Sequence, residues 1–243
     1  MCAAFADQAR AGGGANIAGA PIVTPGQQEF GNTGDGAWGG CEGASWWNLP
    51  LIVGDRVAID WETATDSRGG PSADTLDVWP IGTTDFSINN THTFESFEIG
   101  ANDKQESTFT ANGSGTFRLM FVNSGCDTND NGAYDFTLNV SHRIVLLLPP
   151  LTRITTTGSQ ISVQVHSADG NPVTAPNLTL TLEGFWQGKW HALGSRTPTN
   201  GLVRFGVSLP RSLKGSTVKL RVQATGSGYQ SATTATRRAF VSR

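Results

Sequence analysis

Apolar and polar positions alternate with a period of two along several short stretches of the chain, most clearly over residues 116–121 and 134–140. Successive side chains of a β-strand point to opposite faces, so this period places one set in a core and the other in water. The segment between the two stretches is rich in Asn, Asp and Gly, which accept the backbone angles of a tight reversal. The pattern predicts a β-hairpin over residues 115–140 with a polar, carboxylate-bearing tip.

Similar short runs recur along the rest of the chain, and no helical period is sustained. They are centred on Ile59, Leu76, Phe97 and Phe109 in the first part, and on Val163, Leu180, Trp190, Phe205 and Leu220 in the second. We therefore expect an all-β protein of two β-sandwich domains. The first resembles a jelly roll of about eight short strands, and the second has roughly six or seven strands, as in immunoglobulin-like sandwiches.

The domain limits follow from an apolar stretch, residues 142–148, that ends in Pro149-Pro150. A proline pair cannot donate to a strand ladder and favours extended geometry, so we expect a terminal strand of the first domain running into a linker. The Ala-, Gly- and Pro-rich start lacks a strand-length alternating run, although Ile22 and Val23 could add an edge pairing. The expected organisation is a flexible or assembly-ordered leader (1–26), a first sandwich (27–148), a linker (149–150) and a second sandwich (151–243).

The formal charge changes sign near the same boundary. Residues 1–141 hold 18 Asp and Glu against 5 Lys and Arg, whereas residues 142–243 hold 2 against 12. Such an asymmetry predicts two modules with different electrostatic partners, and it allows copies to attract one another head to tail. The alternative is that the two modules have different ancestries.

The basic residues of the second half are spread over several predicted strands, without the aromatic interleaving of a single-strand nucleic-acid binder. They are Arg204, Arg211, Lys214, Lys219, Arg221, Arg237 and Arg238. The expected partner is therefore the acidic half of another copy, or an anionic wall polymer or glycan, and not nucleic acid. A solvated charged face is the alternative.

Short motifs of the first half, Val53–Asp60, Asp74–Val78, Ser114–Leu119 and Gly132–Leu138, resemble the bacterial pre-peptidase C-terminal family. The resemblance covers about 90 residues and implies an extracellular accessory β-sandwich, not a catalyst. In the second half, Ser167–Val173 and Asn200–Phe205 resemble bacterial Ig-like repeats of surface proteins.

The tip of the predicted hairpin, from Asp127 to Gly132, has the form D-x-N-x-N-G that opens a calcium loop. Asp127, Asn129 and Asn131 would place oxygen ligands at alternate positions, and Gly132 would allow the sharp turn. The closing Glu of the helical calcium motif is replaced by Leu138, but Asp135 could supply a ligand earlier in the chain. We predict a calcium site at Asp127, Asn129, Asn131 and Asp135; the alternative is a capped turn without an ion.

Cys41 and Cys126 both lie beside Gly-rich turns of the acidic half, and we expect them to form one disulfide. The alternative is a pair of reduced cysteines in a cytosolic protein. If Cys41 and Cys126 form the disulfide, Cys2 has no cysteine left to pair with; it could instead bear a lipid.

A Gly-rich loop from Ala37 to Trp47 holds Trp38, Trp46 and Trp47. Flat aromatic rings could stack on sugars there, which makes the three tryptophans a weak candidate ligand site. Burial in a core or between domains is the favoured alternative, because large aromatic side chains bury well.

Catalysis finds little support in the sequence. The four histidines lie far apart, and neither G-x-S-x-G nor H-E-x-x-H occurs. No apolar run approaches the roughly 18 residues of a membrane span. We predict a secreted or surface-displayed, non-catalytic protein with a structural or adhesive role, whose copies could associate head to tail into a filament or surface array. The alternatives are a pair of carbohydrate-binding modules from a secreted hydrolase, or a virion structural protein.

Overall fold

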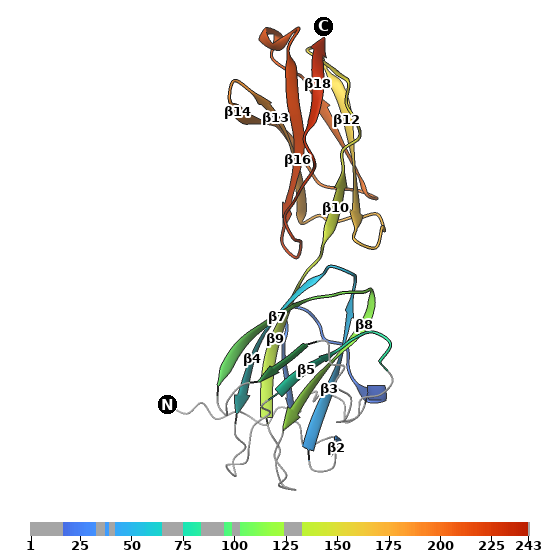
Figure 1. The fold of residues 1–243 in the computed structure, drawn as a ribbon, viewed down its shortest axis with the longest axis vertical. Coiled ribbons are helices and arrows are strands. Elements are labelled where there is room, and N and C mark those ends of the chain that lie inside the picture. Colours follow the sequence, from blue (N-terminus) through green and yellow to red (C-terminus); the bar gives the residue numbers. More distant parts are fainter. Residues whose placement is uncertain are drawn as a thin grey trace. The chain divides into compact units, whose positions relative to one another are not determined.

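The computed structural model describes residues 17–32, 37–38, 42–64, 75–83, 95–98, 103–123 and 133–242. Apart from short 3-10 turns such as Ile17–Gly19, the regular elements of these residues are β-strands. The chain divides into two compact units, Met1–Val140 and Ser141–Arg243 (Figure 1). The prediction of an all-β protein of two β-sandwiches is confirmed.

Unit 1 consists of two sheets, which contain five and four strands of the described residues. The larger has the order β2-β3-β8-β5-β6 and the smaller has the order β1-β9-β4-β7. The strands are β1 (Gln28–Asn32), β2 (Ala37–Trp38), β3 (Glu42–Leu51), β4 (Arg56–Ala64), β5 (Thr75–Trp79), β6 (Glu95–Glu98), β7 (Lys104–Thr110), β8 (Gly115–Asn123) and β9 (Ala133–Ser141).

The core of unit 1 lies between these sheets and is built mainly from aromatic side chains. Phe117 and Phe121 of β8 and Phe136 of β9 are fully buried, as the period-two pattern predicts. The rings of Phe121 and Tyr134 stack with centroids 4.0 Å apart and planes 12° apart. Because β8 and β9 belong to different sheets, this stack joins the two layers.

The predicted hairpin over residues 115–140 is therefore wrong as a pairing, although both of its strands exist. β8 pairs with β3 and β5, whereas β9 lies between β1 and β4 in the other sheet. Alternation shows which side of a strand is buried, but it does not identify the neighbour that completes its hydrogen bonds. Two strands with one apolar side each can face one another across the core from opposite sheets, or they can lie side by side in one sheet.

The stretch that was expected to be a loop up to Trp47 contains the strand β3 instead. Its inward residues include Trp47 and Leu49, while Ala44 and Trp46 are buried on the opposite face of the sheet. With apolar side chains on both faces the strand has no alternation, so the expected signal is missing. Trp46 belongs to a small second cluster with Ala20, Ala44, Trp79, Met120 and Val122.

The described part of the predicted leader belongs to the sandwich. Ile22 forms a parallel bridge with Asn48, and the Val23 N–H donates to the Asn48 carbonyl at 2.9 Å. The Val23 side chain is buried in the core of unit 1. The predicted edge pairing is thus made within the chain, and residues 17–26 are part of the first domain.

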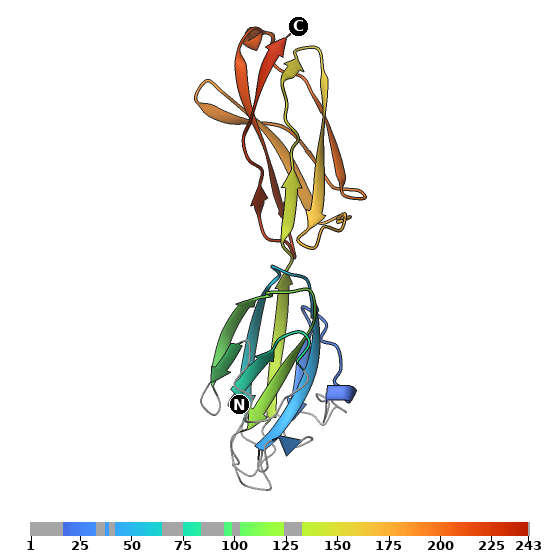
Figure 2. The same ribbon diagram turned by 45° about the vertical axis from the view of Figure 1, so that its right-hand side comes forward.

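Unit 2 is also a sandwich, formed by the sheets β10-β12-β15 and β11-β18-β16-β13-β14, with β17 on β16. Figure 2 shows β12, in yellow, in one layer and β18, in red, in the other. The strands are β10 (Ile144–Leu147), β11 (Arg153–Thr155), β12 (Ser159–Ser167), β13 (Leu178–Trp186), β14 (Lys189–Arg196), β15 (Leu202–Val207), β16 (Thr217–Gly226), β17 (Ala232–Thr233) and β18 (Arg237–Ser242). This distribution of strands between two sheets is of the immunoglobulin type, as predicted.

The boundary between the units lies earlier than expected. β10 pairs with β12, from Ile144 opposite Ser167 to Leu147 opposite Gln164, so the stretch 142–148 belongs to unit 2. The proline pair 149–150 separates β10 from β11, which joins the other sheet of the same unit. The proline pair therefore lies within unit 2, at the point where the chain passes from the edge strand of one sheet to the edge strand of the other. It does not link two domains.

Candidate functional site

The predicted calcium and disulfide residues lie mostly outside the described parts of the chain. Asp127, Asn129, Asn131, Cys41 and Cys126 are among them. Asp135 is described: it is half-buried on β9, where the neighbouring Tyr134 and Phe136 point into the core. The calcium site and the disulfide both stay predictions.

The sugar-stacking hypothesis is corrected for two of its three tryptophans. Trp46 is 4% exposed and Trp47 is 1% exposed, so neither ring offers a face to a ligand. Trp47 packs edge-on against Phe136 with ring centroids 5.2 Å apart. Trp46 and Trp47 are therefore packed in the interior, which was the favoured alternative. The side chain of Trp38 lies outside the described residues.

The main candidate site is an exposed sheet face of unit 2, which we call the basic aromatic face. It consists of Arg153, Phe185, Trp190, Lys219, Arg221, Arg238 and Phe240. Val218, Leu220 and Val222 of β16 fill the core, so the alternate residues Lys219 and Arg221 must point outward. The same alternation turns Arg238 and Phe240 of β18 outward.

Strand register brings four of these side chains into one row across the strands β18, β16, β13 and β14, which Figure 1 labels. Arg238 lies opposite Lys219, Lys219 opposite Phe185, and Phe185 opposite Trp190. Neighbouring strands are about 4.8 Å apart, so the row runs about 14 Å across the sheet. The Lys219 ammonium lies over the Phe185 ring at 5.4 Å, and the rings of Phe185 and Trp190 have centroids 5.3 Å apart.

A second cation is fixed beside this row. The Arg221 guanidinium lies 4.0 Å from the centroid of the Trp190 ring, and its Nε donates to the Glu183 carboxylate at 2.7 Å. Glu183 neutralises Arg221, so the face keeps the positive charge of Arg153, Lys219 and Arg238, all of which are exposed. Phe240 adds an apolar side chain that is 43% exposed.

The sequence shows no aromatic interleaving of these basic residues, so it did not reveal the contacts between cations and rings on this face. Lys219 and Arg221 lie about 30 residues after Phe185 and Trp190 in the chain, so no local window contains both kinds of residue. Only the pairing of β13 with β14 and β16 brings them together. The period-two pattern of β16 indicated which residues point outward, but it did not indicate the register.

Unit 1 presents a face of opposite charge on the sheet β1-β9-β4-β7, which we call the acidic face. It is defined by Asp60, Glu62, Glu106 and Asp135, with Lys104 among them, around a hollow of about 490 Å³. Asp60 lies opposite Glu106, and Glu62 lies opposite Lys104 and forms an ion pair with it. The hydrogen bond from Lys104 to Glu62 and the charge of Glu62 raise the pKa of the Lys104 ammonium, and the charge of Asp135 adds to this effect.

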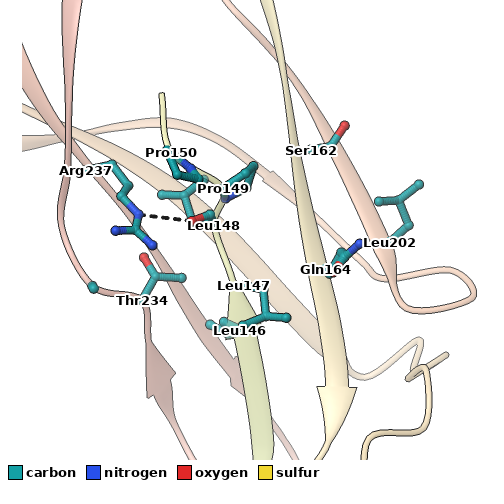
Figure 3. Close-up of a pocket in the computed structure, with 11 residues that line it drawn as sticks. Leu146, Leu147, Leu148, Pro149, Pro150, Ser162, Gln164, Leu202, Thr234 and Arg237 are labelled. Carbon is teal, nitrogen blue, oxygen red and sulfur yellow. Dashed lines mark hydrogen bonds between the residues drawn. The ribbon is translucent and has the colours of Figure 1, made fainter. Parts of the chain in front are cut away.

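A separate groove of about 570 Å³ lies in unit 2 beside Leu146–Pro150 (Figure 3). Arg237 Nε donates to the Leu148 carbonyl at 3.1 Å, while Gln164 and Leu202 lie on the other side of this segment in the view. Leu147 lies opposite Gln164, and Gln164 lies opposite Leu202, which places all three on the outer face of their sheet.

The described residues that line this groove are mostly neutral. Arg237 is its one ionisable lining residue, so the Ser162 and Thr234 hydroxyls have no His, Asp or Glu beside them in the lining to act as a base. Among the described residues no three His, Cys, Asp or Glu side chains are grouped so that they could hold a metal ion. In the same residues no helix has the length and apolar character needed to cross a membrane.

Comparison with known proteins identifies no family for this chain. No family model matches it, so the resemblance to the pre-peptidase C-terminal family stays a prediction. No curated protein matches it either.

Three solved structures are similar to it at low identity. The FN1–FN3 domains of chicken CNTN1 are 11% identical, with 96% of this chain and 69% of that chain covered and a TM-score of 0.27. A DUF4785 family protein of Legionella pneumophila is 12% identical, with 90% and 63% covered and a TM-score of 0.30. An exo-chitosanase of Amycolatopsis orientalis is 14% identical, with 81% and 25% covered and a TM-score of 0.23. The strands of the chain define its fold class.

Proposed function

We propose that this protein is a non-catalytic structural or adhesive protein of the cell exterior, whose copies associate through an acidic unit 1 and a basic unit 2. The observation that carries the proposal is the opposite charge of the two sandwiches, 18 acidic against 5 basic residues before position 142 and 2 against 12 after it. When unit 1 of one copy attracts unit 2 of another copy, the contact is made by two different surfaces of the chain. Such a heterologous contact, where it does not close into a ring, extends into a filament or array.

The character of the exposed faces supports this proposal. The acidic face of unit 1 and the basic aromatic face of unit 2 are both outer faces of sheets, where side chains are available to another molecule. The lining of the unit 2 groove, with one guanidinium and otherwise neutral residues, supports a binding or structural role over an enzymatic one. The glycan-module alternative loses support, because Trp46 and Trp47 are buried.

The proposal is tested by light scattering and negative-stain microscopy of the whole chain at low and high salt. Attraction between exposed charges weakens as the Debye length falls from about 30 Å at 0.01 M to about 8 Å at 0.15 M salt. We expect large particles or fibres at low salt that dissociate as salt is added. A monomer at every salt concentration, over a wide range of protein concentration, would contradict self-association.

A further inference from the structure

We propose that the contact between copies is made by two specific sheet faces: the acidic face of one copy docks on the basic aromatic face of the next. This inference rests on the proposed self-association and names the surfaces that carry it. It commits to a second copy of this chain as the occupant of the basic aromatic face.

The two faces match in form. The acidic face is the outer side of the four strands β1-β9-β4-β7, and the basic aromatic face lies on the outer side of β11-β18-β16-β13-β14, where β11 contributes Arg153 at the edge. The row from Arg238 to Trp190 crosses four strands and spans about 14 Å, which equals the distance between the outermost axes of the four strands of the acidic face. Face-to-face packing of sheets is the usual way in which two such surfaces are covered.

The two faces also match in charge. The residues that define the acidic face have four carboxylates and the ammonium of Lys104, and the exposed Arg56 lies further along β4 on the same side of the sheet. The basic aromatic face has the four cations Arg153, Lys219, Arg221 and Arg238, and the single carboxylate of Glu183. Glu62 pairs with Lys104 and Glu183 pairs with Arg221, and the formal charges sum to −3 for the residues that define the acidic face and to +3 for those of the basic aromatic face together with Glu183. Complementary charge of this kind steers encounter and sets the register of the docked partners.

The aromatic side chains favour a folded partner over a charged polymer. Phe240 is 43% exposed, and Phe185 and Trp190 are half-buried beside the cations. A docked sheet would remove these rings from water, and interface centres are enriched in aromatic residues and Arg. On the acidic side, Phe30 of β1 lies opposite Asp135 and supplies a half-buried aromatic side chain.

The test reverses the charge of exposed residues in the full-length chain. The variant Lys219→Glu/Arg238→Glu changes the basic aromatic face, and the matched control Arg204→Glu/Arg211→Glu makes the same change of net charge elsewhere, on β15 and the 3-10 turn Arg211–Leu213. We expect the first variant to lose low-salt assembly and the control to assemble like the wild type. Circular dichroism and melting of each variant establish that it is folded, and Lys219→Ala/Arg238→Ala replaces the first variant if it is not.

A complementary pair makes the test specific. Asp60→Lys/Glu106→Lys turns the acidic face basic, and this variant alone should also stay monomeric. Mixed with Lys219→Glu/Arg238→Glu, it should assemble again, because each face in the mixture then meets one of opposite charge.

The outcomes separate this inference from the proposed function. If the wild type assembles and both face variants assemble equally well, the faces are wrong while self-association stands. Loss of assembly in the Arg204→Glu/Arg211→Glu control would show that net charge alone matters and would overturn the inference. A wild type that stays monomeric at low salt but binds heparin, used as a probe for anionic polysaccharides, would overturn both and assign the basic face to a polymer.

Discussion

The indole N–H of Trp47 donates to the Tyr134 hydroxyl at 2.7 Å, and this buried hydrogen bond joins the two sheets of unit 1. The same hydroxyl donates to Ser45 Oγ at 2.6 Å. Trp47 and Ser45 lie on β3, and Tyr134 lies on β9 of the other sheet. A polar network inside an aromatic core is favourable only while its members remain paired.

Tyr134→Phe should therefore destabilise unit 1 even though it keeps the ring. The substitution removes the acceptor of the Trp47 N–H and the donor to Ser45, and loss of a buried partner costs about 1–3 kcal/mol. Urea unfolding followed by tryptophan fluorescence measures the change. Tyr229→Phe in unit 2 is the control, since Tyr229 is only half-buried, and it should change stability by less than about 0.5 kcal/mol. An unchanged midpoint for Tyr134→Phe would contradict this role for the hydroxyl.

Trp190→Ala should weaken unit 2 and its association together. The Arg221 guanidinium lies 4.0 Å from the Trp190 ring, and a cation–π contact of this kind contributes about 0.5–2 kcal/mol. Thermal unfolding measures the loss of stability, and low-salt light scattering measures the loss of assembly. Trp190→Phe is the control: it keeps a ring under Arg221 and should keep most of both properties. Equal losses for Phe and Ala would contradict the role of an aromatic ring under Arg221.

The sequence predicted the buried side of most strands but not their neighbours. Phe117, Phe121 and Phe136 are buried as their alternation indicates, yet β8 and β9 belong to opposite sheets. Register between segments distant in the chain depends on tertiary packing, which a period of two does not encode. The basic aromatic face was missed for the same reason, because Trp190 and Arg221 meet only through two pairings with β13.

The earlier domain boundary predicts how fragments behave. A fragment of residues 141–243 should fold, whereas 151–243 should be unstable, because it lacks β10 and leaves the edge of β12 unpaired. Ile144 and Leu148 are buried in unit 2, and losing both costs about 3–6 kcal/mol. Thermal unfolding of the two purified fragments measures the difference. A stable, cooperative 151–243 fragment would contradict the assignment of β10 to unit 2.

Calcium binding by the segment around Asp127 remains a prediction, since Asp127, Asn129 and Asn131 lie outside the described residues. Added calcium should raise the melting temperature of unit 1, because a ligand bound only by the folded state stabilises it by about 2.7 kcal/mol at one hundred times its Kd. Calorimetry with calcium or with chelator measures the shift, and Asp127→Asn should abolish it.

Asp169→Asn in unit 2 provides the matched control for this calcium test. Its carboxylate accepts a hydrogen bond from the Ser167 hydroxyl and another from the Asn171 side chain at 2.8 Å, and these bonds lower the pKa of Asp169. These oxygens are already paired within a protein turn, so Asp169→Asn should leave the calcium-induced shift intact. An identical melt with calcium and with chelator in the wild type would rule out the site, and loss of the shift in both variants would argue against its assignment to Asp127.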